Sequence, residues 1–204
     1  MLLDLLRPFS FLTITHPTRK PLIINWVVPI ILAGLVTSIG LFTADKIDVF
    51  GSSGLISRLL GFVQSLPGFY IAALAAIATF NNKDMLKPMP GTPPIGTVVY
   101  NGYPERVPMN RRRFLSSMFA YLTVLSIGLT LLAVIYLTVA PTVKDVVSAV
   151  HCQILKSAAI YIYLVFVCQM VAVTLWGLYY LGDRLHTPDS LDSSPPDSQS
   201  AKIP

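Results

Sequence analysis

The stretch NNKDMLKPMPGTPPIGTVVYNGYPERVPMNRRR, residues 81–113, decides the fold because it separates two strongly apolar halves of the chain. It contains six prolines and three glycines, which exclude one continuous helix. Six of its residues are Lys or Arg and only two are acidic. We therefore interpret residues 81–113 as a basic connector that lies outside the bilayer, between two pairs of membrane helices.

A short β-hairpin is predicted inside this connector. Ile95–Tyr100 and Tyr103–Val107 have the composition of strands, and Asn101-Gly102 between them is the strongest two-residue signal for a hairpin turn. Pro104 and Pro108 confine the second strand to an edge, because proline cannot donate a ladder hydrogen bond.

Outside the connector, the chain has the composition of an integral membrane protein. Of its 204 residues, 53% are hydrophobic and 12% are charged, whereas soluble domains carry about 25% charged residues. Its apolar blocks reach the length of about 20 residues that crosses a hydrocarbon core. The sequence predicts an all-α membrane protein with four transmembrane helices and a short β-hairpin in the cytoplasmic connector.

Breakers and composition divide the chain into five parts. Pro67-Gly68 is expected to separate a short amphipathic helix from the second span, and Pro141 to end the third span. Residues 142–181 contain no breaker and predict one long fourth helix of about 60 Å. The predicted parts are an N-terminal cytoplasmic or interfacial arm (1–22), a first transmembrane hairpin (23–80), the connector (81–113), a second transmembrane hairpin (114–182) and a disordered cytoplasmic tail (183–204).

The distribution of basic residues predicts the orientation in the membrane. The arm holds three Lys or Arg, the connector six and the tail two, while the two other links with their amphipathic segments hold four. Because Lys and Arg accumulate in cytoplasmic loops, we expect the connector and both termini to be cytoplasmic.

Small and polar residues within the apolar blocks are candidates for contacts between helices. Gln169 lies in the middle of the fourth span, where it could line a pore, although an interhelical hydrogen bond is the favoured interpretation. A stripe at helical spacing in the third span allows close helix packing or self-association. Its residues are Ser116, Ala120, Thr123, Ser126 and Thr130.

The three arginines at the end of the connector, Arg111, Arg112 and Arg113, allow three interpretations. They are a stop signal at the membrane boundary, a site for anionic lipid, or a docking site for an acidic protein surface. In the third interpretation Arg106, Tyr100 and Tyr103 contribute. Direct recognition of duplex nucleic acid is the least favoured, because one basic run beside a bilayer leaves little room for a groove.

No pattern for catalysis or for a cofactor is present in the sequence. The chain contains no phosphate-binding loop, nucleophile elbow, zinc-protease motif or paired carboxylates. His151-Cys152 lacks the further ligands that zinc requires. We therefore expect a protein that is not an enzyme and that needs no cofactor.

The arm ending in THPTRKP (15–21), the four spans, the basic connector ending in NRRRF (110–114) and the long fourth helix resemble the small membrane subunit of the Kiwa antiphage defence system. The resemblance covers the whole chain. It implies an oligomeric protein of the bacterial inner membrane that senses phage attack at the envelope. It also implies a cytoplasmic DNA-binding partner, so that nucleic acid is met only through that partner.

Two functional hypotheses follow. The first is a non-enzymatic sensor and anchor subunit that recruits and switches a cytoplasmic effector protein, with membrane lipids and further copies of itself as additional partners. The alternative is an oligomeric channel that depolarises the membrane, lined by Gln169, the small-residue stripe and the long fourth helix.

Overall fold

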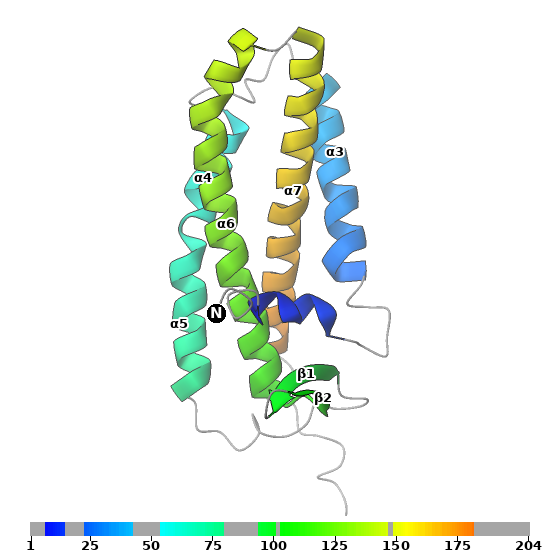
Figure 1. The fold of residues 1–204 in the computed structure, drawn as a ribbon, viewed down its shortest axis with the longest axis vertical. Coiled ribbons are helices and arrows are strands. Elements are labelled where there is room, and N and C mark those ends of the chain that lie inside the picture. The colour runs from blue at the N-terminus through cyan, green and yellow to red at the C-terminus, as the bar shows by residue number, and fades with distance from the viewer. Residues whose placement is uncertain are drawn as a thin grey trace, which may run out of the picture.

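The computed structural model describes residues 7–14, 23–42, 54–79, 94–100, 103–146 and 149–181. Helices dominate this part of the chain, with one antiparallel hairpin between the second and third apolar stretches (Figure 1). The predicted fold class is therefore confirmed. In chain order the elements are η1 (Arg7–Thr13), η2 (Ile23–Val27), α3 (Val28–Phe42), α4 (Leu55–Val63), α5 (Leu66–Thr79), β1 (Ile95–Tyr100), β2 (Tyr103–Pro108), α6 (Arg111–Val146) and α7 (Ala149–Tyr179).

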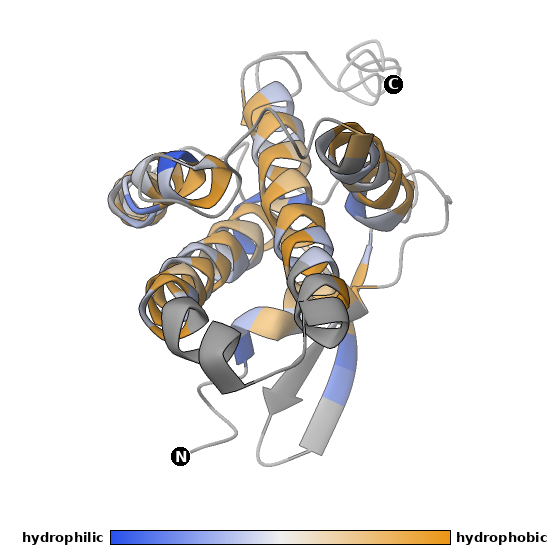
Figure 2. Ribbon diagram, turned by 90° about the horizontal axis from the view of Figure 1, so that it is seen from above, coloured by the Kyte–Doolittle hydropathy of each residue, from blue (hydrophilic) through white to orange (hydrophobic). Residues whose placement is uncertain are grey.

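Four helical stretches are long and apolar enough to cross a membrane, namely Ile23–Gly40, Leu55–Thr79, Arg111–Val139 and Ser157–Tyr179. Figure 2 shows apolar residues around the helices rather than along one inward stripe. Many large apolar side chains, such as Ile39, Leu132 and Leu175, are exposed on the bundle surface. A helix that is apolar on all sides needs an apolar environment, so the chain is a multi-pass membrane protein.

The helices form a row in which α6 and α7 are the central pair. Helix α5 packs on α6, α4 also packs on α6, and α3 packs on α7 (Figure 1). The helices of the predicted first hairpin, residues 23–80, therefore lie on opposite sides of the central pair instead of packing along one another. Sequence order alone could not show this, because every span is apolar enough to pack on any other.

The prediction that Pro141 ends the third span, and that one long helix then covers residues 142–181, is wrong. Helix α6 continues through Pro141 to Val146, and α7 begins at Ala149. A proline inside a helix removes the hydrogen bond to the carbonyl of residue i−4, here Leu137, and its ring crowds that carbonyl, yet α6 runs through it as one helix of 36 residues. Helix α7 is consequently about 46 Å long and not about 60 Å.

The second span is divided into two helices, as predicted, but the division precedes Pro67. Helix α4 ends at Val63, Gln64 caps it, and the Ser65 hydroxyl donates a hydrogen bond of 2.8 Å to the Phe62 carbonyl. Pro67 is the second residue of α5. Proline is tolerated in the first turn because the missing N–H has no partner within the helix there.

The predicted hairpin is present. Strands β1 and β2 pair antiparallel from Ile95 opposite Pro108 to Tyr100 opposite Tyr103, a register that leaves a two-residue connection. The hairpin continues into α6 through Met109, whose backbone N–H donates a hydrogen bond of 3.0 Å to the Pro94 carbonyl. The Met109 side chain covers Gly96 so closely that a Cβ there would lie 2.6 Å from its sulfur.

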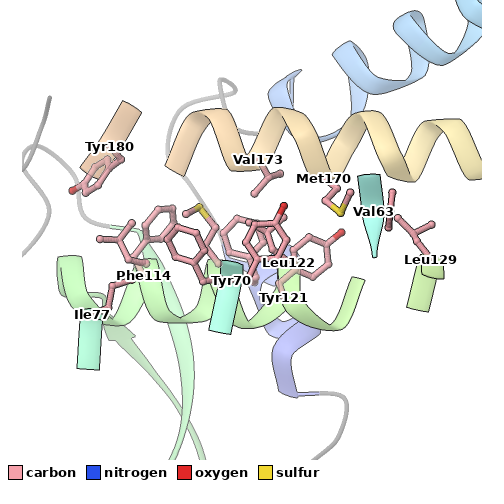
Figure 3. Close-up of a cluster of buried hydrophobic side chains, with 14 of the residues drawn as sticks. Val63, Tyr70, Ile77, Phe114, Tyr121, Leu122, Leu129, Met170, Val173 and Tyr180 are labelled. Atoms are coloured by element: carbon pink, nitrogen blue, oxygen red, sulfur yellow. The ribbon is translucent and has the colours of Figure 1, made fainter. Parts of the chain in front are cut away.

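The larger core lies at the end of the bundle that carries the hairpin. Figure 3 shows its side chains from α5, α6 and α7 meeting between the helices. Phe114 is central to this core, because its ring packs against three other aromatic rings. The distances between ring centroids are 5.9 Å to Phe11 of η1, 5.7 Å to Trp176 of α7 and 6.1 Å to Tyr180 of α7. A smaller cluster towards the opposite end joins α3, α4, α6 and α7 through Ala33, Ile56, Ala133, Ile160, Leu164 and Val165.

Candidate functional site

The three arginines that open α6 have three different environments. Arg111 is only 2% exposed, Arg112 is half-buried and Arg113 is exposed. Successive residues of a helix point about 100° apart, so one side chain of the three turns into the bundle while another turns away from it. Of these three predicted contact residues, Arg113 has the greatest access to a partner.

Arg112 connects the two ends of the connector. Its guanidinium donates a hydrogen bond to the backbone carbonyl of Ala78, in the last turn of α5. The last carbonyls of a helix lack partners within the helix and carry the negative end of its dipole, so a guanidinium is a suitable donor. Arg112 therefore holds the end of α5 beside the start of α6.

Arg106 is exposed on β2, opposite Thr97 of β1. Ile95 and Pro108, which share its face of the hairpin because residues alternate between faces along a strand, are exposed as well. Gly96 and Val107 occupy the other face, where Gly96 is buried under Met109. Arg106 thus lies on the outward face of the hairpin.

The backbone register does not place the two predicted tyrosine positions with Arg106. Tyr100 and Tyr103 are directly opposite each other, and alternation puts both positions on the face of Gly96 and Val107. The predicted contact set is therefore divided between two faces of the hairpin. Arg106 and Arg113 are the exposed arginines of that set.

Gln169 is 0% exposed and lies between α6 and α7. The Tyr121 hydroxyl donates a hydrogen bond of 3.1 Å to its Oε1 atom. Its Nε2 atom has no hydrogen-bond partner among the described residues. Gln169 thus makes a hydrogen bond between helices: its side chain extends from α7 towards Tyr121 of α6.

The small-residue stripe of α6 contributes close packing more than bonds between helices. Ser126 is fully buried and the other four residues are half-buried. Hydroxyls of the stripe donate to carbonyls of their own helix, Thr123 to Phe119, Ser126 to Thr123 and Thr130 to Ser126, at 2.8–2.9 Å. Such bonds satisfy the hydroxyls inside an apolar span without a second helix.

The sequence reasoning missed the tyrosines that link the helices. Tyr121 bonds Gln169, and the Tyr70 hydroxyl of α5 is 2.7 Å from the Thr174 Oγ1 atom of α7. A hydroxyl within an apolar span was the available signal, because a polar group in hydrocarbon requires a partner. The identity of each partner depends on helix rotation and could not be found from spacing.

Within the described ranges, no group of three or more His, Cys, Asp or Glu side chains is placed to hold a metal ion. The expected absence of a cofactor and of enzymatic activity remains a prediction. Comparisons with protein-family models, with curated proteins and with solved structures found no match.

Proposed function

We propose that the protein is a non-enzymatic membrane subunit that anchors a soluble effector and switches it. The observation that carries this proposal is the presence of two exposed arginines, Arg106 and Arg113, at the one end of the bundle where a hairpin projects. The hairpin runs directly into α6 and is fixed to it by Met109. A partner held on this surface is therefore connected to a membrane helix without a flexible linker between them.

The chemistry of the surface favours a partner with carboxylates. A guanidinium presents a planar fork of donors that matches a carboxylate, and such charge-assisted pairs are stronger than neutral hydrogen bonds. Arg113 also lies in the first turn of a candidate span, where an anionic lipid headgroup would compete for it. The same surface could thus bind a lipid headgroup at Arg113 and a partner protein at Arg106.

The resemblance to the membrane subunit of Kiwa supports a place for this function in antiphage defence. In that setting the protein is a sensor of the bacterial inner membrane, and the effector is a cytoplasmic DNA-binding protein. The broad exposed apolar surfaces of the flanking helices α3 and α5 are compatible with self-association in the bilayer. Both termini and the hairpin then face the cytoplasm.

This orientation predicts that a cysteine placed at Asn101 is labelled only from the cytoplasmic side. In a background with both native cysteines replaced by serine, Asn101→Cys should react with a membrane-impermeant maleimide in inverted vesicles but not in intact spheroplasts. The reason is the excess of Lys and Arg on the connector side. Labelling in intact spheroplasts would contradict the orientation.

Partner docking predicts that the double variant Arg106→Ala/Arg113→Ala loses its effector. Co-purification of the protein encoded by the neighbouring reading frame should fall by about tenfold or more, because removing one side of a buried charge pair costs about 2 kcal/mol or more. The measurement is an affinity pull-down from solubilised membranes, with the amount of inserted protein compared in the membrane fraction.

Arg58→Ala is the matched control, because Arg58 is an exposed arginine of α4, remote in sequence from the hairpin. It should retain the effector at the wild-type level. A double variant that inserts normally and still captures the effector as the wild type does would overturn the proposed function.

The alternative function, an oligomeric channel, has no observation in its favour in the described structure. Gln169, the residue expected to line the pore, is enclosed between α6 and α7 and bonded to Tyr121. A pore would require this bond to break or α7 to rotate.

A further inference from the structure

The N-terminal element η1 inserts one buried side chain into the bundle. Arg7, Phe9, Ser10 and Leu12 are exposed, whereas Phe11 is 4% exposed. A seven-residue 3-10 helix has no independent stability, because runs of this length have poor hydrogen-bond geometry. Phe11 belongs to the buried core, and Ile14, the residue after η1, packs against the same core.

Phe11 contacts two rings of α6. Its ring stacks on Tyr121 at 5.4 Å with an interplanar angle of 25°, and it lies 5.9 Å from the ring of Phe114. Phe9 contacts the same tyrosine edge-on at 6.0 Å. The Tyr121 ring is thus positioned by two aromatic residues of η1.

The same short helix also packs on the hairpin. Among the described elements, β1 contacts its partner strand β2 along its length and η1 at a few residues. Strand β2 reaches the bundle through the chain itself, which continues into α6. Helix η1 is therefore a non-covalent connection between β1 and the membrane helices, in addition to the contacts of Met109 with Pro94 and Gly96 (Figure 1).

Tyr121 extends this connection to the centre of the bundle. Its hydroxyl donates to Oε1 of Gln169 on α7, while Nε2 of the same amide has no hydrogen-bond partner among the described residues. The orientation of the Gln169 amide consequently depends on one bond from one ring. A displacement of that ring removes the polar link between α6 and α7 at this level.

We propose that η1 is a strap that couples the hairpin to the α6–α7 interface, with Phe11 as the releasable anchor and Tyr121–Gln169 as the element that responds. With the strap docked, the hairpin is held and the interhelical bond is formed. With the strap released, both loosen together. This coupling rests on the proposed docking function for its role in switching, because a partner on the hairpin would then act on the packing of the membrane helices.

The test uses the purified full-length protein without any partner, in a Cys152→Ser background that leaves Cys168 as the single cysteine. Cys168 is half-buried and adjoins Gln169 in α7, so its modification rate by a small maleimide reports on the packing of α7 at the level of Gln169. Amide hydrogen exchange of residues 95–100 reports on the hairpin. Phe11→Ala should raise both rates by about tenfold, since exchange and labelling follow the population of the open state.

Three further variants separate coupling from general loss of structure. Leu12→Ala, an exposed position of the same helix, should leave both rates unchanged. Tyr121→Phe keeps the ring but deletes the hydroxyl, so it should accelerate Cys168 labelling and leave hairpin exchange unchanged. Phe11→Leu, which keeps an apolar anchor, should raise both rates by about threefold and decides the question if Phe11→Ala does not fold.

A folded Phe11 variant that accelerates exchange only within η1, with residues 95–100 and Cys168 as in the wild type, would show that η1 is a passive cover and would overturn the coupling. Because no effector is present, that outcome leaves the docking proposal untouched. Conversely, a pull-down that contradicts the docking proposal would leave the predicted rates of Cys168 labelling and of hairpin exchange unchanged.

Discussion

Replacing Phe114 by alanine is expected to lower the free energy of unfolding by about 3 kcal/mol, the lower end of the range for a buried phenylalanine. Phe114 is 1% exposed and its ring contacts η1 and two aromatic side chains of α7. Lipid tails are as apolar as a protein core, so the loss comes less from transfer to water than from the cavity and the missing ring contacts.

The measurement is denaturant unfolding of the purified protein in micelles, followed by tryptophan fluorescence in a Trp26→Phe background. The remaining Trp176 contacts Phe114. Phe62→Ala is the matched control, because Phe62 is 49% exposed on α4. That control should change the free energy of unfolding by less than about 1 kcal/mol. Equal losses in the two variants would show that Phe114 does not hold the end of the bundle together.

The second large effect is expected at Gly177, where the backbone of α7 lies against Met118 of α6. A Cβ at this position would collide with the Met118 methyl group and lie 3.2 Å from the Met118 sulfur. Met118 is 0% exposed, so its flexible end can yield only within a packed core. Gly177→Leu should therefore lower the free energy of unfolding by about 2 kcal/mol through overpacking.

Gly128→Leu provides the control for helix propensity, because no atom lies within 4 Å of a Cβ built at Gly128 in α6. It should be neutral or stabilising by about 0.8 kcal/mol, since glycine is a poor helix former. Adding Met118→Ala to Gly177→Leu should restore part of the lost stability, because the two residues share one space. Strict additivity of the two changes would contradict the close approach.

The spans and the hairpin could be predicted because their signals are local. An apolar block of about 20 residues has few alternatives to a membrane helix, and Asn101-Gly102 between two strand-like runs favours a two-residue connection. Pro141 misled the prediction because the cost of an interior proline, a lost hydrogen bond and crowding at the carbonyl of residue i−4, does not by itself end a long helix. In the structure, α6 continues past Pro141 to Val146.

The candidate contact surface was predictable in composition and not in geometry. Arg111, Arg112 and Arg113 are equivalent in the sequence, yet one is buried, one bonds the Ala78 carbonyl and one is exposed. The difference follows from the rotation of α6 about its axis, which depends on contacts with α5, α7 and η1. No spacing rule contains that rotation, because the arginines are consecutive.

By itself, the sequence determined that the chain crosses a membrane with four helices and carries a hairpin within a basic connector between the second and the third. Length, hydropathy and turn chemistry act within a few residues, so they can be read along the chain. Only the tertiary structure decided the row order of the helices, the insertion of Phe11 beside Tyr121 and the exposure of Arg106 and Arg113. In a bilayer all apolar faces are nearly equivalent partners, so shape complementarity and a few interhelical hydrogen bonds choose among them.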